Sequence, residues 1–341
     1  PRPKASMPLP TTPERLMIRL RALLRSSEPT LLGFAALIGI LSGVVVVVIA
    51  SITQGLHVLL YGIDPDEKLS ATAVIDWWHA AIPVAGGALL GLVIYIFRNR
   101  RRLIVDPIEA NALHGGQMSL GDSLRVGFEN TISNGFGASV GLEAGYTQVA
   151  SGIASTLGAR FGLRRTDLRL MVGCGSAGAI AAAFGGPLTG AFYAFELIIG
   201  VYSVANVAPV LIAALAGYLV SRALGLEAHI ITISDGIQVD AGHYPPYLAL
   251  GLLLGLLAIG MMRLITLVER GFQTSRLPRY FRPAVGGVAV GALALITPQA
   301  LSGGHGALYL NLATTPALGT LIIVILAKIA ATSASVGSGF R

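Results

Sequence analysis

The chain contains many apolar stretches of bilayer-spanning length, and no other feature constrains its fold more. A transmembrane helix needs about 20 mostly apolar residues. We predict candidate spans at approximately residues 30–58, 81–97, 123–140, 143–159, 170–200, 205–224, 246–268, 283–299 and 317–335. Only 12% of the residues are charged, whereas soluble domains average roughly 25%. Because a bilayer offers backbone groups no water, these stretches predict an all-α polytopic membrane protein.

Basic residues gather in short segments between the apolar stretches, and this pattern predicts the orientation. Cytoplasmic loops of membrane proteins carry an excess of lysine and arginine. The basic segments are the amphipathic arm within residues 1–28, Arg98 to Arg102, Arg160 to Arg169 and Arg276 to Arg282. We therefore expect a cytoplasmic N-terminus and a bacterial inner (plasma) membrane location. The net charge of +7 reflects this topology, and no motif indicates a nucleic-acid partner.

Cysteine and histidine usage argues against a disulfide, a metal centre or a cofactor. The lone cysteine, Cys174, excludes an intrachain disulfide, and no histidine or cysteine spacing resembles a zinc site. An intramembrane hydrolase that uses Ser176 with His305 is the alternative from another functional class. It lacks the G-x-S-x-G pattern, because Cys174 replaces the first glycine. We expect a protein that is not an enzyme and needs no cofactor.

An internal repeat indicates duplicated architecture. PVAGGALLG, which begins at Pro83, and PAVGGVAVG, which begins at Pro283, share one pattern of proline, glycine pairs and apolar residues. Duplicated halves are typical of transporters, which bind their substrate between the repeats. The first half follows a basic arm and the second follows an acidic segment around Asp240, so we expect inverted topology. The predicted repeats are residues 29–244 and 245–341, the second being incomplete in this sequence.

Glu143 is the only charged residue between Glu129 and Arg160. An ionised side chain near the bilayer centre costs at least about 2.5–3.5 kcal/mol, so such residues usually have a function. The surrounding segment SNGFGASVGLEAGYTQ is rich in glycine. Glycine allows the backbone to leave helical geometry and present its N–H groups, as small-ion sites in membranes require. Glu143 is therefore predicted to be a titratable gate in an ion pathway.

Three segments together resemble one family, the CLC chloride channels and chloride/proton antiporters. These segments are CGSAGAIAAAFGGPLTGAFYAFE at residues 174–196, VGLEAG at 140–145 and SGGHGAL at 302–308. The resemblance implies an inverted repeat of tilted and broken transmembrane helices, transport of chloride or a similar anion, contact with membrane lipid, and a homodimer. It also implies that Glu143 gates a pathway formed by the backbone of Gly141, Leu142, Ala144 and Gly145.

Two departures from the family pattern bear on mechanism. The family's G-S-G-I-P anion motif should fall in RLIVDPIEANAL, where Pro107 is retained but Ile104 or Val105 replaces the serine. Glu196 matches a family glutamate and is a candidate inner acid. Leu197 occupies the position at which proton-coupled members often carry a second glutamate. We therefore favour a passive channel over a chloride/proton antiporter, for which protons would be the second substrate.

Overall fold

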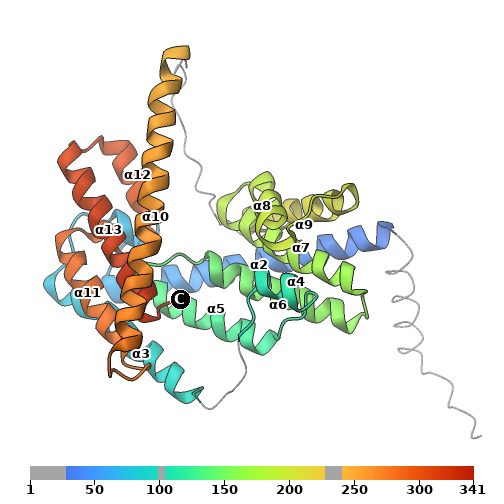
Figure 1. Ribbon diagram of the computed structural model, residues 1–341, viewed down its shortest axis with the longest axis horizontal. Helices are drawn as coiled ribbons and strands as arrows, with labels where there is room; N and C mark the ends of the chain where they lie inside the picture. Colours follow the sequence, from blue (N-terminus) through green and yellow to red (C-terminus); the bar gives the residue numbers. More distant parts are fainter. Residues whose placement is uncertain (1–27, 99–103, 227–239) are drawn as a thin grey trace, which may run out of the picture. The chain divides into compact units, whose positions relative to one another are not determined.

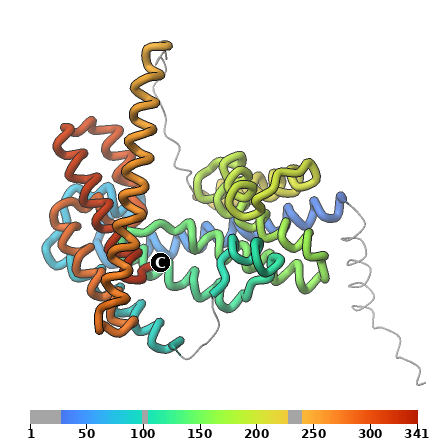
Figure 2. Tube along the Cα trace, viewed as in Figure 1, coloured from blue at the N-terminus to red at the C-terminus, as the bar shows by residue number. Residues whose placement is uncertain are grey.

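The computed structural model describes residues 28–98, 104–226 and 240–341 (Figures 1 and 2). Every regular element within these residues is helical, which confirms the predicted all-α class. The basic segment predicted at residues 1–28 lies, except for its last residue, outside the described residues.

The described residues form two compact units, each assembled from separate stretches of the chain. The first contains the described parts of Pro1–Val46, Ile104–Leu124 and Tyr146–Ala228. The second contains those of Val47–Leu103, Arg125–Gly145 and His229–Arg341. The expected division into repeats at residues 244 and 245 is a separate matter and stays a prediction.

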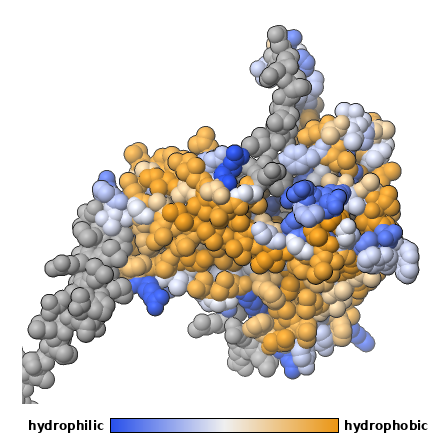
Figure 3. All heavy atoms as spheres, turned by 180° about the vertical axis from the view of Figure 1, so that it is seen from behind, coloured by the Kyte–Doolittle hydropathy of each residue, from blue (hydrophilic) through white to orange (hydrophobic). Residues whose placement is uncertain are grey.

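Among the described residues, six helical segments are long and apolar enough to cross a membrane. They are α2 (Glu28–Tyr61), Trp77–Ile96 (η2, Trp77–Ala81, with α3, Ile82–Ile96), α7 (Arg165–Phe184), α9 (Val204–Ala223), Ala241–Thr274 (η4, Ala241–His243, with α10, Tyr244–Thr274) and α13 (Leu318–Ser338). Each coincides with a predicted span or with part of one. Apolar side chains cover much of the surface seen in Figure 3, as expected for a protein surrounded by lipid.

Two predicted spans become helices that are shorter or more polar than expected. The span predicted at 123–140 is α5 (Leu120–Gly135), which ends before the buried segment 137–140, and the span at 143–159 is α6 (Glu143–Arg160). Neither helix is apolar enough to count as a membrane span on its composition alone. The reason is that α5 buries polar side chains: Ser123, Glu129, Asn130, Thr131, Ser133 and Asn134. These side chains face protein, so the helix does not need an apolar surface all around.

Other bounds also differ from the prediction. The stretch 170–200 is interrupted and contains part of α7, then α8 (Pro187–Tyr193) and the π-helix η3 (Ala194–Ile199). Gly185, with φ of 66°, ends α7 in a left-handed conformation that favours glycine. The span at 283–299 is α11 (Arg282–Ile296). Four short helices were not predicted as spans: α4 (Pro107–Leu113), η1 (Leu69–Ala71), η5 (Pro298–Ala300) and α12 (His305–Thr314).

The first unit is built around α7, which packs against α8 and α9 and is buried over most of its length. Small residues allow these backbones to approach closely, as is common between membrane helices. A Cβ at Gly217 of α9 would collide with the backbone of Gly178 in α7. The core beside this contact consists of Phe34, Ile38, Met171, Phe195 and Val210 with surrounding alanines.

In the second unit the two copies of the sequence repeat, in α3 and α11, pack directly against each other. A Cβ at Gly87 would meet the carbonyl of Pro283, and a Cβ at Gly287 would meet the carbonyl of Pro83. In the same way, a Cβ at Gly91 would meet the carbonyl of Tyr280, and a Cβ at Gly291 would meet the carbonyl of Ala80. Reciprocal contacts of this kind require a local two-fold relation. Inverted repeats are related in this way, so the packing supports the predicted duplication.

Candidate functional site

The segment between α5 and α6 leads to Glu143 and is held by side chains of α5. Residues 137–140 are buried and form no regular helix. The Asn134 side-chain amide donates to the carbonyl of Val140 at 2.6 Å. One turn earlier, the Asn130 amide donates to the carbonyl of Gly141 at 2.9 Å. These bonds satisfy backbone acceptors that a non-helical segment would otherwise leave unpaired at high cost.

Three other parts of the second unit hold the same segment. From α13, Ser335 Oγ accepts from the backbone N–H of Ser139 at 3.0 Å. From α2, the Tyr61 hydroxyl donates to the carbonyl of Phe136 at 3.1 Å. From the loop before α12, the backbone N–H of Ser302 donates to the carbonyl of Gly137 at 3.3 Å. The segment that ends at the candidate gate is therefore fixed on several sides.

Glu143 is the first residue of α6, and its carboxylate folds back over Gly141. Any Cβ at Gly141 would collide with that carboxylate, so glycine leaves the space that the side chain occupies. Glu143 Oε1 lies 3.9 Å from His305 Nε2, at the start of α12. The side chains of Glu143 and His305 are 33% and 38% exposed, so solvent and ions can reach the pair.

The other predicted pathway residues surround the start of α6. Gly141 and Leu142 are partly buried, Ala144 is exposed and Gly145 is buried. A Cβ at Gly145 would collide with the side chain of Asn130. The structure thus brings Glu143, Gly141 and the first turn of α6 together, supported by an asparagine that the sequence did not single out.

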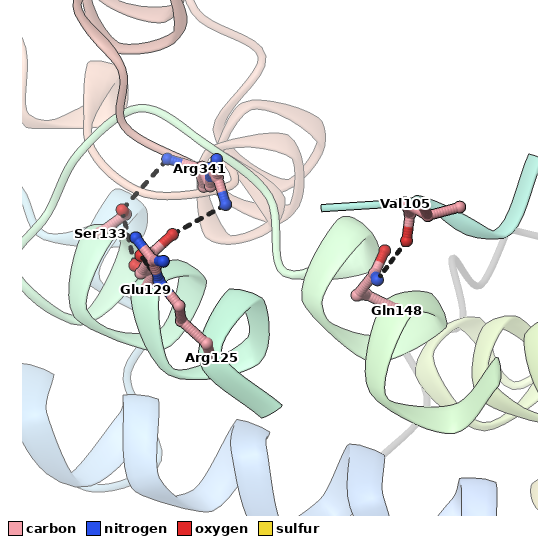
Figure 4. A network of polar contacts seen from close by, with 6 residues as sticks. All are labelled: Val105, Arg125, Glu129, Ser133, Gln148 and Arg341. Atoms are coloured by element: carbon pink, nitrogen blue, oxygen red, sulfur yellow. Dashed lines mark hydrogen bonds and ion pairs between the residues drawn. The ribbon is translucent and has the colours of Figure 1, made fainter. Parts of the chain in front are cut away.

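A buried ion-pair network lies on the same helix as these asparagines (Figure 4). Glu129 is 1% exposed and accepts from Arg125 Nε at 2.7 Å and from Arg341 Nη1 at 2.8 Å. The backbone N–H of Arg341 also donates to Ser133 Oγ at 3.2 Å. Glu129 therefore fastens the segment that follows α13 to α5, beside the residues that hold the loop before Glu143.

The degenerate first anion motif lies in the first unit and is also shown in Figure 4. Ile104 and Val105 precede α4, and Pro107 is its first residue. The backbone carbonyl of Val105 accepts a hydrogen bond from the side-chain amide of buried Gln148 at 3.0 Å. The same amide lies 3.3 Å from Ser123 Oγ. A buried glutamine thus binds Val105, one of the two positions at which the resemblance implied a serine hydroxyl.

The candidate inner acid, Glu196, lies in the π-helix of the first unit. Glu196 is exposed, and the Tyr202 hydroxyl donates to its carboxylate at 3.2 Å. Desolvation raises the pKa of Tyr202 first, and the hydrogen bond and charge of Glu196 raise it further. Leu197 is 49% exposed and carries no group that can bind a proton.

The sequence of the chain matches a known family. The family described as voltage gated chloride channel matches residues 86–341, well over half of the chain. The chain belongs to this family. A putative ClcB-like chloride channel protein of Ralstonia nicotianae is 30% identical over 317 residues, which are 91% of this chain and 73% of the relative. A voltage-gated ClC-type chloride channel, ClcB, of Shigella flexneri is 29% identical over 275 residues, which are 79% of this chain and 65% of that protein.

Solved CLC structures share the fold. A slow cyanobacterial Cl⁻/H⁺ antiporter superposes with a TM-score of 0.75 at 20% identity, covering 91% of this chain and 74% of the other. A CLC-type fluoride/proton antiporter gives 0.70 at 20% identity, covering 92% and 76%. The predicted CLC-like fold of tilted and broken helices is therefore confirmed.

Sequence reasoning missed four residues that support the candidate site. Asn130 and Asn134 lie one helical turn apart in the polar part of α5, a spacing that places both on one helix face. Glu129 went unnoticed because its partner Arg341 is distant in sequence. Lys328 is the only charge of α13, and its ammonium donates to the carbonyl of Ser302 at 2.6 Å. The argument that selected Glu143, a lone charge in an apolar stretch, would also have selected Lys328.

We predict that Glu129→Gln destabilises the protein by about 3 kcal/mol, because removing one partner of a buried ion pair leaves the arginines uncompensated. The thermal unfolding midpoint in detergent should fall. The matched control is Asp122→Asn, a partly exposed acid in the first turn of α5, which should cost no more than about 1 kcal/mol. Equal midpoints for the two variants would contradict the role given to Glu129.

Proposed function

We propose that this protein carries chloride or a similar anion across the membrane through a CLC-type pathway gated by Glu143. The observation that carries the proposal is the position of one carboxylate at the start of α6. It lies over Gly141 and beside His305, and the segment leading to it is fixed by α2, α5, α13 and the loop before α12. Family membership supports the proposal.

Helix physics explains why an anion would bind where that carboxylate lies. An α-helix carries about half a positive charge at its N-terminus, where its first N–H groups have no acceptor within the helix. Such ends bind anions without a buried cation. The start of α6, from Gly141 to Gly145, is the proposed anion position. Neutral donors also hold an anion weakly enough to release it, which conduction requires.

Competition between the carboxylate and the anion would make the pathway a gate. An ionised Glu143 occupies the attractive region at the helix start and repels a second negative charge. Protonation removes both effects, since a neutral carboxyl group neither repels an anion nor gains from the helix dipole. Flux should therefore rise as the pH falls.

A passive channel is our first choice, and a chloride/proton antiporter is the alternative. Leu197 cannot carry protons, and the curated relatives are named as chloride channels. The solved structures with the same fold are described as chloride/proton and fluoride/proton antiporters. Glu196, with Tyr202 on its carboxylate, is an acid that a coupled mechanism could use.

The hydrolase alternative draws little support from the surroundings of Ser176. Ser176 Oγ is buried and makes a hydrogen bond with Ser151 Oγ at 2.7 Å. A catalytic serine needs a neighbouring base. His305, the base that the hydrolase reading would use, lies beside Glu143, so the contacts of both residues favour the transport reading.

We further propose the setting in which this pathway works. The protein would be a homodimer embedded in lipid in a bacterial inner membrane, with its N-terminus in the cytoplasm. The basic segments between spans favour that orientation, and the family resemblance favours the dimer. The apolar, exposed surface of α10 is suited to lipid or to other transmembrane helices.

We predict that Glu143→Gln makes anion flux high and independent of pH, because the amide cannot ionise. In liposomes, flux through the variant at about pH 7.5 should match flux through the wild-type protein at about pH 3, where glutamate side chains of model peptides are largely protonated. Glu269→Gln, an exposed change on α10, should keep the wild-type profile. A variant Glu143→Gln that keeps the wild-type pH response would remove Glu143 as the gate.

The reversal potential of chloride current across a pH gradient separates the channel from the antiporter. A passive channel follows the chloride gradient alone, so imposing a pH gradient should leave the reversal potential unchanged. An exchanger couples the two ions, and its reversal potential would shift toward a value set by both gradients. Such a shift would replace the channel with the antiporter and would leave the gate proposal intact.

A further inference from the structure

The loop before α12 is held on two sides in a conformation that L-residues seldom adopt. Ser302 has a φ of 54°, in the left-handed region. Its hydroxyl donates to Asn134 Oδ1 at 3.0 Å, its N–H donates to Gly137, and its carbonyl accepts from Lys328 Nζ at 2.6 Å. Such conformations persist where surrounding contacts over-determine them, and they are frequent at functional sites.

Lys328 extends this support to the rest of the loop. Its ammonium also donates to the carbonyls of Ala300, at 3.2 Å, and Leu301, at 3.4 Å. A Cβ at Gly304 would lie 3.2 Å from the Lys328 side chain. The single cation of α13 thus binds the backbone from Ala300 to Ser302, shortly before α12 begins.

The contacts of Lys328 and Ser302 place His305, the first residue of α12. Its ring lies against Gly303, and a Cβ at Gly303 would lie 3.8 Å from the Cα of Gly141. The imidazole therefore lies beside the glycine over which Glu143 folds, with Nε2 3.9 Å from the carboxylate. Ser302, Lys328 and Asn134 connect this histidine to the same scaffold that holds the gate segment.

The charges around His305 define how the pair can respond to pH. Charged residues near His305 include Glu143 from α6, Lys328 from α13 and Lys68, the residue before η1, whose Cβ lies next to Gly306. On α12 itself the titratable group is Tyr309. Glu143 is the one acid in this set. Lys328 is engaged by three carbonyls, and the imidazole of His305 faces the Glu143 carboxylate at 3.9 Å.

We propose that His305 is a positioning residue that latches the Glu143 gate. A protonated imidazole attracts the ionised carboxylate and holds it over Gly141 in the blocking position. Acid would then act in two opposed ways: protonation of His305 strengthens the latch, and protonation of Glu143 releases it. This inference rests on the proposed gating function and adds the group that sets its pH range.

The direction of the effect follows from the charges. Replacing His305 with glutamine removes the cation that favours the ionised form of Glu143, so less acid is needed to release the gate. The pH midpoint of flux activation should therefore rise, by an amount that solvent screening of this partly exposed pair keeps small. His305→Lys keeps a cation at this position, so its midpoint should not rise.

The test measures the pH midpoint of chloride flux in liposomes for the wild-type protein, His305→Gln and His305→Lys. The matched control is His114→Gln, which breaks a second exposed histidine–glutamate pair, with Glu109 at 3.5 Å, and should leave the midpoint unchanged. If His305→Gln fails to fold, the lysine variant decides: a midpoint raised toward alkaline pH would overturn the proposal. In a folded His305→Gln, an unchanged midpoint would overturn it.

A Glu143→Gln background separates failure of the latch from failure of the gate. Adding His305→Gln to that background should change nothing, because the carboxylate is already absent. If Glu143→Gln abolishes the pH response while His305→Gln leaves the wild-type midpoint unmoved, the latch is wrong and the gate stands. If Glu143→Gln retains the pH response, the gate proposal falls and the latch falls with it.

Discussion

A buried backbone segment without regular helical hydrogen bonds must find other partners, and this requirement organises the second unit. A bilayer supplies no water to such groups, so each unpaired carbonyl or N–H would cost several kcal/mol. Residues 137–140 are buried and non-helical, side chains of α5 and α13 bind them, and Tyr61 of α2 binds the carbonyl of the preceding residue, Phe136. The same bonds that satisfy the backbone also fix where α6 begins. The position of Glu143 is a consequence of that solution.

The sequence repeat explains how two short α-helices pack stably in the second unit. Alpha helices α3 and α11 are each shorter than a bilayer is thick, and they meet through reciprocal contacts of Gly87 with Pro283 and of Gly287 with Pro83. Close backbone approach increases van der Waals contact, the main attraction between helices in lipid. Glycine is needed at both positions because any side chain would displace the facing carbonyl. The sequence pattern from which we predicted a duplication is therefore also the contact surface between α3 and α11.

Much of the fold could be predicted because hydropathy reports directly on burial in lipid. The long apolar helices α2, α9, α10 and α13 fall at the predicted places. The ends of helices that face protein were harder to predict. The buried polar side chains of α5, for example, lower its hydropathy although the helix lies inside the protein. The short helices α4 and α12 escaped prediction because their apolar content is too brief to distinguish them from loops.

The candidate site was only partly readable from sequence, for reasons of distance along the chain. Glu143 stands out locally as a charge in an apolar stretch, and the structure places it at a helix start beside Gly141. Asn134 and Glu129 acquire their roles from Ser302 and Arg341, which are far away in sequence. At Val105, one of the two positions where a serine hydroxyl was expected, the backbone carbonyl instead accepts a hydrogen bond from Gln148. Such long-range pairings depend on the folded geometry.

The central claim is that an ionised Glu143 and an anion compete for the same helix start. Chloride binding measured by calorimetry at two pH values tests this competition without requiring transport. Affinity of the wild-type protein should fall as the pH rises through the carboxylate titration, whereas Glu143→Gln should bind chloride equally well at both pH values. An equal loss of affinity with rising pH in the two proteins would contradict the claim.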